Sequence, residues 1–244
     1  MAVVRWLACD EGEPDPSASW LSARDRRRLE AMAYTKRFDE ARLSRWTAHR
    51  AVALSVGLGD AVEALGRVEI FNEADGSPRA RAPGAGALSI SSTDRAGWAV
   101  TTVLRGEAPI GCDLELVEPR SPAFVRDYFT EREQTLVAAA PLPSDVTANL
   151  IWSAKESALK VLRTGLRKDT RSVQVDLEPT GGDGWRPLTV THASETMSGW
   201  WRRYGAFLLT FASASAHPPP KSLVEPSPLE GAEPAHSWLG RPLR

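Results

Sequence analysis

The chain has 244 residues and a mass of 26.6 kDa, and 42% of its residues are hydrophobic and 25% charged. This length excludes a mini-protein, and the composition excludes a wholly disordered or fibrous chain. No apolar run approaches the ~20 residues that span a bilayer, and residues 1–10 lack the pattern of a secretory signal. We therefore expect a globular, cytoplasmic protein.

Cysteine, histidine and charge narrow the kinds of site that the chain can form. The two cysteines, Cys9 and Cys112, are too few for a disulfide framework, and the four histidines form no evident zinc site, so carboxylates are the expected metal ligands. The net charge is −1, but residues 24–50 hold nine Lys/Arg and four Asp/Glu. This basic segment indicates either an anionic ligand or a solvated helix face in an arginine-rich chain.

The first half of the chain predicts helices followed by strands. Residues 21–56 hold few helix breakers and carry apolar residues at near-helical spacing, which predicts two helices with a break near Tyr34 or Thr35. A strand over 67–72 is expected to end in the turn Asp75-Gly76-Ser77-Pro78. Two further strands joined by a turn at 94–96 are expected over 87–93 and 97–104.

The second half predicts a strand, two helices and then further strands. Residues 109–117 alternate, so that Asp113 and Glu115 share one face of a strand. The helices are expected over 130–139 and 146–162, and the later strands over 172–177, 188–192 and 206–213, with a turn at 180–184. From His217 onward, seven prolines in 28 residues are typical of an unfolded tail, unless Trp238 and Leu239 anchor it.

Two clusters carry candidate chemistry. In Gly111-Cys112-Asp113-Leu114-Glu115 the carboxylates lie roughly 6–7 Å apart on one face, where they can hold a hard cation such as Mg²⁺. A stripe at helical spacing combines aromatic, acidic and basic side chains: Trp152, Lys155, Glu156, Leu159 and Lys160. Taken singly, each cluster is also explained without function, as an exposed acidic strand face and as a Glu-to-Lys helix pair.

Taken together, the two clusters resemble the Sfp-type 4′-phosphopantetheinyl transferases. That family carries a Gly-x-Asp-x-Glu strand and, later in the chain, a Trp-x-x-Lys-Glu-x-x-x-Lys helix. Both motifs are complete here, with Trp152 39 residues after Asp113. Gly165-Leu166 and the segment 124–133 also resemble family segments. The resemblance covers about residues 20–213 and is strongest over 111–166.

The resemblance implies an α+β fold. Two similar halves are expected about a pseudo-twofold axis, with the active site in the cleft between them. Residues 1–108 would form the half that binds coenzyme A, residues 109–215 the half with the metal and catalytic motifs, and residues 216–244 a disordered proline-rich tail. A monomer is the expectation from the family.

The activity implied by the resemblance is Mg²⁺-dependent transfer of 4′-phosphopantetheine from coenzyme A. The acceptor would be a serine hydroxyl of an acyl or peptidyl carrier protein of fatty acid, polyketide or nonribosomal peptide synthesis, and 3′,5′-ADP would be released. Asp113, Glu115 and Glu156 would hold Mg²⁺, for which Mn²⁺ is the alternative. Glu156 would also be the base for the carrier serine, directly or through a water, and Lys160 the acid or charge stabiliser for the departing 3′,5′-ADP.

The resemblance also assigns contacts to coenzyme A. These residues are Lys36, Arg37, Arg45, His49, Ser91, Ser92, Asp113 and Lys155. His49 stands where lysine is commoner, so its contact would depend on pH. Ser92 replaces a family histidine and Ser77 a family lysine, which removes two cations from the site, with Arg79 or Arg81 as candidates to replace them.

Two other functions are compatible with the sequence. The substitutions at Ser77 and Ser92 favour a relative that binds coenzyme A or carrier proteins without turnover. The basic segment 24–50 favours a nucleic-acid binder, but it lacks interleaved aromatic residues and any recognised nucleic-acid motif. We therefore expect neither a nucleic acid nor a membrane as a partner. The particular carrier protein and the tolerance for acyl-coenzyme A are not predicted.

Overall fold

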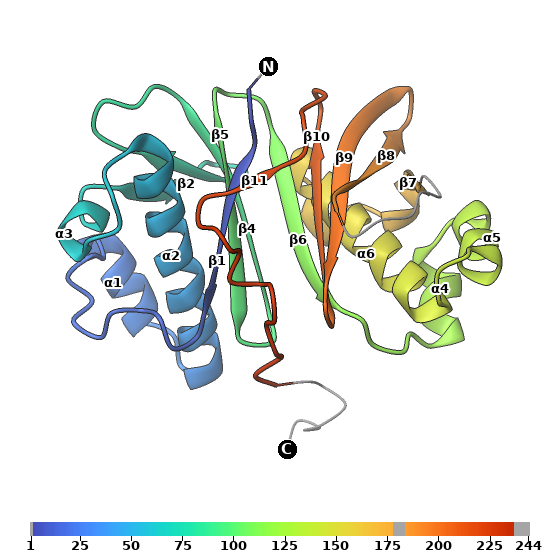
Figure 1. Ribbon diagram of the computed structural model, residues 1–244, viewed down its shortest axis with the longest axis horizontal. Coiled ribbons are helices and arrows are strands. Elements are labelled where there is room, and N and C mark those ends of the chain that lie inside the picture. The colour runs from blue at the N-terminus through green and yellow to red at the C-terminus, as the bar shows by residue number, and fades with distance from the viewer. Residues whose placement is uncertain (1, 178–183, 237–244) are drawn as a thin grey trace.

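The structure is a computed structural model that describes residues 2–177 and 184–236, apart from the side chain of Leu166. Two β-sheets meet in the middle of the molecule, and the helices gather at its two ends (Figure 1). This arrangement confirms the predicted α+β fold of two halves. No helix in the described part of the chain is long and apolar enough to cross a membrane.

The N-terminal half packs a long helix against an antiparallel sheet. Its elements are β1 (Arg5–Asp10), α1 (Ala23–Glu30), α2 (Thr35–Val56), α3 (Val62–Leu65), β2 (Glu69–Asn72), β3 (Pro78–Arg81), β4 (Leu88–Arg95) and β5 (Trp98–Arg105). The predicted break near Tyr34 is confirmed, since Tyr34 is extended between α1 and α2. Helix α2 ends at Gly57, whose φ of +85° favours glycine. Its buried face, which includes Trp46 and Val52, packs on the sheet.

The C-terminal half repeats this combination of helix and sheet. Its elements are β6 (Ile110–Leu116), α4 (Pro122–Tyr128), α5 (Glu131–Ala139), α6 (Ser144–Val161), two short 3₁₀ turns (Gly165–Arg167 and Thr170–Ser172), β7 (Val173–Leu177), β8 (Arg186–His192), β9 (Glu195–Tyr204) and β10 (Phe207–Ser213). The strand order is β6-β10-β9-β8-β7, so β6 lies at an edge of the sheet. Helix α6 lies so close to β6 that a Cβ on Gly111 would be 1.9 Å from the carbonyl oxygen of Ser157. Glycine at this position therefore allows α6 to approach the predicted carboxylates.

The two sheets are joined along β4 and β6. Ser91 Oγ accepts a hydrogen bond from the backbone N–H of Cys112 (3.1 Å), and Thr93 Oγ1 accepts one from that of Leu114 (3.3 Å). These hydroxyls satisfy amides of an edge strand that would otherwise be buried without partners. An apolar cluster that includes Trp6 and Phe211 fills the space between the sheets. The junction that holds the candidate site is therefore rigidly built.

The prediction of a disordered tail is wrong for residues 217–236, which we call the C-terminal strap. The strap forms β11 (Lys221–Ser222), which pairs in parallel with β1, and it descends along the junction of the sheets (Figure 1). Leu229 is fully buried, and Trp98 Nε1 donates to the carbonyl oxygen of Glu233 (2.9 Å). The strap has no local periodicity because its single apolar residues fill a groove made by distant strands. Trp238, Leu239 and most of the turn predicted at 180–184 lie outside the described residues.

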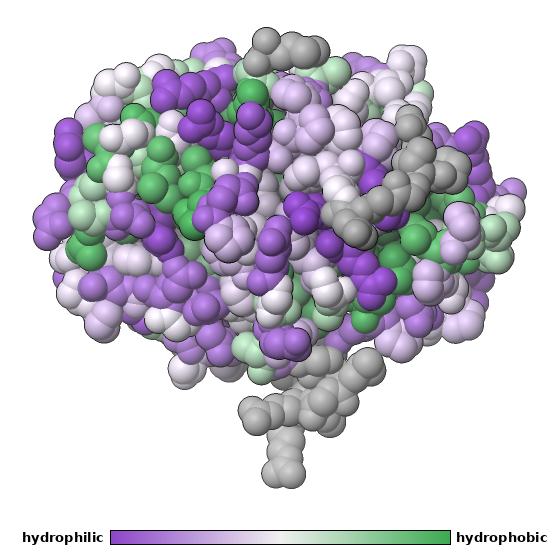
Figure 2. All heavy atoms as spheres, viewed as in Figure 1, coloured by the Kyte–Doolittle hydropathy of each residue, from purple (hydrophilic) through white to green (hydrophobic). Residues whose placement is uncertain are grey.

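On the face seen in Figure 1, hydrophilic and neutral residues cover most of the junction, and hydrophobic patches lie nearer the two ends (Figure 2). The elements that were not predicted from the sequence are strands β1, β3, β9 and β11 and helices α3 and α4.

Candidate active site

Asp113 projects from β6 toward α6 at the junction of the two halves. It is 3% exposed, and its Oδ1 accepts hydrogen bonds from Lys160 Nζ (3.0 Å) and Thr93 Oγ1 (3.1 Å). Its Oδ2 is buried and has no hydrogen-bond partner. A buried carboxylate oxygen without a partner is unfavourable, so Asp113 is poised to accept a further cation or donor.

Glu115 lies two residues along the same strand and is already paired. Its Oε1 accepts from Trp152 Nε1 (3.1 Å), and its Oε2 is 3.2 Å from Arg120 Nη2 and 3.4 Å from Arg95 Nε. Burial, followed by the repulsion of Asp113, raises the pKa of Glu115. The two guanidinium groups oppose this shift and hold the carboxylate in place.

Glu156 faces the same carboxylates from α6. Trp152, Glu156 and Lys160 follow one another at four-residue spacing, so they share the face of α6 that packs on β6. Burial, followed by the charges of Asp113 and Glu115, raises the pKa of Glu156 to about 7. Within the described residues, no side chain donates a hydrogen bond to this carboxylate, which therefore remains available to a ligand.

Lys160 connects the carboxylates to the backbone of β6. Its Nζ donates to the carbonyl oxygen of Cys112 (2.8 Å) as well as to Asp113. Burial lowers the pKa of this ammonium, but Asp113 and Glu156 outweigh that effect and raise the pKa above its usual value. Lys160 is therefore a fixed positive charge at neutral pH.

The chemistry of these oxygens suits a hard divalent cation, although they are not gathered into a finished metal site. The unpartnered Asp113 Oδ2 and the repulsion among the three carboxylates would both be relieved by a cation. However, in the part of the chain that the structure describes, no group of three or more His, Cys, Asp or Glu side chains is placed to hold a metal ion. Glu115 would have to exchange its guanidinium partners to join Asp113 and Glu156.

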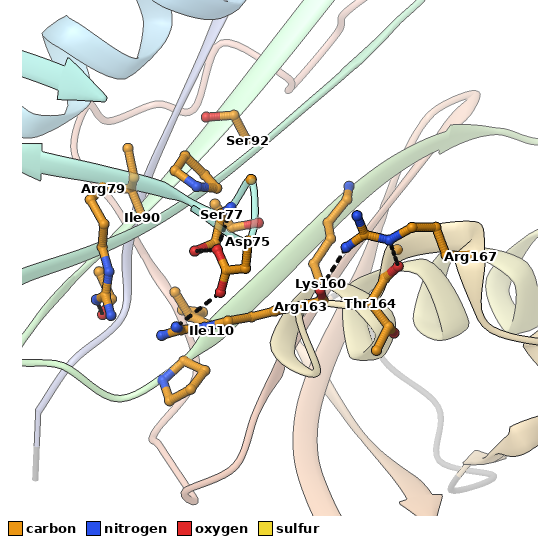
Figure 3. Close-up of a pocket in the computed structure, with 16 residues that line it drawn as sticks. Asp75, Ser77, Arg79, Ile90, Ser92, Ile110, Lys160, Arg163, Thr164 and Arg167 are labelled. Carbon is orange, nitrogen blue, oxygen red and sulfur yellow. Dashed lines mark hydrogen bonds and ion pairs between the residues drawn. The ribbon is translucent and has the colours of Figure 1, made fainter. Parts of the chain in front are cut away.

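A cavity of about 660 Å³ opens between the two halves beside Lys160 (Figure 3). The turn from Asp75 to Arg79 and strand β4 line one side, and the end of α6 with residues 163–165 and Arg167 lines the other. A second cavity of about 660 Å³ lies between α1, α2 and the N-terminal sheet. Both cavities are lined by Pro78 and Ser92, so they adjoin. Lys160 lines the first cavity, whereas the carboxylates of Asp113, Glu115 and Glu156 are not among the groups that line either one.

Several residues assigned to coenzyme A line these cavities. Arg37 and Arg45 line the second cavity, Ser91 lines the first, and Ser92 lines both. The Ser91 hydroxyl is committed to β6, whereas Ser92 Oγ is 2.9 Å from Thr101 Oγ1. Lys36 is placed differently, in an ion pair with Glu40 (3.7 Å) beside a smaller pocket of about 110 Å³.

The assignment of His49 to a coenzyme A phosphate is wrong. His49 is fully buried, its Nδ1 is 3.0 Å from the carbonyl oxygen of Leu65, and its ring packs edge-on against Trp20. Burial lowers the pKa of this imidazole, so it is uncharged as well as inaccessible. The spacing along α2 could not show this, because Trp20 and Leu65 come from other segments.

The assignment of Lys155 to coenzyme A is also wrong. Lys155 is fully buried, and its Nζ is 2.8 Å from Glu133 Oε2 and donates to the carbonyl oxygens of Thr170 and Val173. Glu133 also accepts a hydrogen bond from the backbone N–H of Val175 (2.8 Å). Lys155 thus points away from the carboxylates, and the ion pair ties α5, α6 and β7 together. It is a positioning residue for α6.

Four further residues of this site were not selected from the sequence: Thr93, Asp94, Arg95 and Arg120. Thr93, Arg95 and Arg120 contact the motif carboxylates from outside the two motifs. Asp94 lines the second cavity, and burial, followed by the charge of Glu40, raises its pKa to about 6. The alternation of β4 was a usable signal for Thr93, because it places Ser91 and Thr93 on one face.

Residues 109–211 match the model of the 4′-phosphopantetheinyl transferase superfamily. The match begins just before β6 and ends within β10, so it contains Asp113, Glu115, Glu156 and Lys160. No curated protein matches the chain. The segment 109–211, which holds the carboxylate site described above, is therefore similar to a domain of the 4′-phosphopantetheinyl transferase superfamily.

Proposed function

We propose that this protein transfers 4′-phosphopantetheine from coenzyme A to a serine hydroxyl of an acyl or peptidyl carrier protein in an Mg²⁺-dependent reaction. The observation that carries the proposal is the junction of β6 and α6. There the unpartnered oxygen of Asp113, the partly exposed carboxylate of Glu156 and the fixed charge of Lys160 lie at the junction of the two halves, and Lys160 also lines the first cavity.

Coenzyme A is the proposed occupant of the two adjoining cavities. Its phosphates require cations, which Arg37 and Arg45 offer in the second cavity and Lys160 in the first. Residues 1–108 would supply most of these contacts, and residues 109–215 the catalytic ones. Figure 3 shows Lys160 and Ser92 on opposite sides of the first cavity, as a ligand bound between the halves requires.

Glu156 is the proposed base. The serine oxygen of the carrier attacks the phosphorus that bears the pantetheine arm, and the serine proton passes to the Glu156 carboxylate. The bond between that phosphorus and the oxygen of 3′,5′-ADP breaks, and the charge of Lys160 stabilises the leaving group. A base with a pKa near the working pH is effective, and burial among like charges gives Glu156 such a pKa.

A divalent cation, Mg²⁺ or Mn²⁺, would be held by Asp113 and Glu156 with Glu115, and when bound it would neutralise charge on the phosphoryl oxygens. Asp113 would serve as the fixed ligand, because β6, Thr93 and Lys160 determine its position. Glu156 would thus have two roles, as ligand and as base. We further propose a monomer that acts in the cytoplasm.

A second candidate function is coenzyme A or carrier binding without turnover, which the serines at 77 and 92 favour. Transfer of a fluorescent coenzyme A analogue to a panel of apo carrier proteins distinguishes the two. We expect labelling with Mg²⁺ that EDTA abolishes and that Glu156→Gln lowers about 10²- to 10⁴-fold. The matched control Glu195→Gln changes an exposed carboxylate on β9 and should label normally. Binding of coenzyme A without any labelling would favour the second function.

A further inference from the structure

Arg163 lies at the mouth of the first cavity, directly after the end of α6. Its side chain extends from that end toward Asp75 in the turn between β2 and β3 (Figure 3). Arg163 Nη1 is 3.2 Å from Asp75 Oδ2. Because Asp75 belongs to the N-terminal half and Arg163 to the C-terminal half, this ion pair crosses the cavity mouth.

The backbone of Arg163 is in a conformation that favours glycine. Its φ is +56°, and its N–H donates to the carbonyl oxygen of Lys160 (3.1 Å) in the turn that closes the helix. A side chain with a Cβ is disfavoured in this left-handed region. The side chains of Arg163 and Asp75 are 34% and 36% exposed, so solvent screens their ion pair, which contributes little net stability. The fold alone does not account for an arginine here.

The other cations that line the cavity are held by fixed partners. Lys160 bonds Asp113 and β6, and Arg167 donates to the carbonyl oxygens of Arg163 and Thr164. Arg79 Nη1 donates to Ser89 Oγ (2.9 Å) within the sheet, in addition to a longer ion pair with Glu73 (3.8 Å). Arg163 is held by a solvent-exposed carboxylate that an anion can replace. Asp75 is itself retained by the N–H and hydroxyl of Ser77, which lower its pKa to about 2. The pair therefore persists at neutral pH until another anion competes for the guanidinium.

We propose that Arg163 is a phosphate-binding residue of this site. A phosphate group of the bound nucleotide displaces Asp75 and accepts hydrogen bonds from the guanidinium, whose planar shape suits bidentate contact. The C-terminal half thereby supplies a cation to a cavity in which positions 77 and 92 are uncharged serines. This inference rests on the proposed function, in which coenzyme A occupies the cavity.

Calorimetric titration of the native protein and the Arg163→Gly variant with coenzyme A tests the inference. Glycine accepts the φ of +56°, so the variant should melt no lower than the native protein. Its Kd for coenzyme A should rise about 10-fold or more. Arg163→Lys should be intermediate, and Asp75→Asn should bind as tightly as the native protein or more tightly. The matched control Arg171→Gln removes an exposed Arg–Asp pair outside both cavities and should leave the Kd unchanged.

Titration with a second ligand, 3′-dephospho-coenzyme A, identifies which phosphate Arg163 contacts. If 3′-dephospho-coenzyme A shows the same loss of affinity, Arg163 contacts the diphosphate; if the loss disappears, it contacts the 3′-phosphate, and either result supports the inference. A folded Arg163→Gly variant that binds coenzyme A within about 2-fold of the native protein overturns the inference and leaves the proposed function standing. A native protein that binds no coenzyme A overturns both.

Discussion

At the scale of single residues, Glu156 gives the molecule a characteristic dependence of stability on pH. Its pKa is about 7 in the folded chain, above the value of 4.5 for an unperturbed glutamate. The folded state therefore binds more protons than the unfolded state between these values, so the free energy of unfolding falls as pH rises through this window. Glu156→Gln removes the charge that causes this loss.

We expect Glu156→Gln to melt at the same temperature as the native protein at pH 4, below the unperturbed pKa of 4.5, and roughly 2 °C or more above it at pH 8. Mg²⁺ should reduce the difference at pH 8, because it compensates the same charge. Differential scanning calorimetry across this range measures both effects. A difference in Tm that does not vary with pH would show that Glu156 is not under repulsion from its neighbours.

At the scale of elements, the buried ion pair of Lys155 and Glu133 fixes α6 against α5 and β7. Removal of one partner leaves the other charge uncompensated, so we expect Lys155→Met to lower the free energy of unfolding by about 3–5 kcal/mol. The double variant Lys155→Met with Glu133→Gln should recover a large part of this loss. Denaturant unfolding measures each variant, and strictly additive losses would contradict a direct ion pair.

The elements also show how far the sequence predicts this site. Strand β6 and helix α6 were predicted because their periodicity is local, and the alternation of β6 places Asp113 and Glu115 together toward α6. The periodicity of a helix does not identify which neighbours cover each face. Lys155 and Glu156 are adjacent in sequence, yet Lys155 is buried by Glu133 and the turn before β7, whereas Glu156 remains accessible. His49 was wrongly assigned to a coenzyme A phosphate for the same reason, because the sequence does not show that Trp20 and Leu65 bury it.

At the scale of the whole molecule, the C-terminal strap lies along both sheets. Leu229 is buried in the apolar cluster between them, so we expect Leu229→Ala to lower the free energy of unfolding by about 2–5 kcal/mol. The control Glu230→Ala removes an exposed ion pair with Arg202 and should change it by less than about 1 kcal/mol. If Leu229→Ala melted at the native Tm, as the control should, the strap would not be packed against the sheets in solution.

The strap was unpredictable from sequence for a physical reason. Its prolines and isolated apolar residues form no repeat that marks a helix or strand, and its order comes from strands more than 100 residues away, as the hydrogen bond from Trp98 to Glu233 shows. The overall α+β fold was predictable because two motifs resemble those of a family with that fold. That Ser91 and Thr93 join the halves was visible only once β4 and β6 lay side by side.

The most direct test of the central claim is the stoichiometry of the transfer reaction. Native protein, coenzyme A and Mg²⁺ are incubated with an apo carrier, and the intact mass of the carrier and the released 3′,5′-ADP are measured together. The account predicts that each modified carrier gains one phosphopantetheine on its serine, with equimolar 3′,5′-ADP, and that Glu156→Gln forms neither product at a comparable rate. Release of 3′,5′-ADP without modification of a carrier, or full activity in Glu156→Gln, would contradict it.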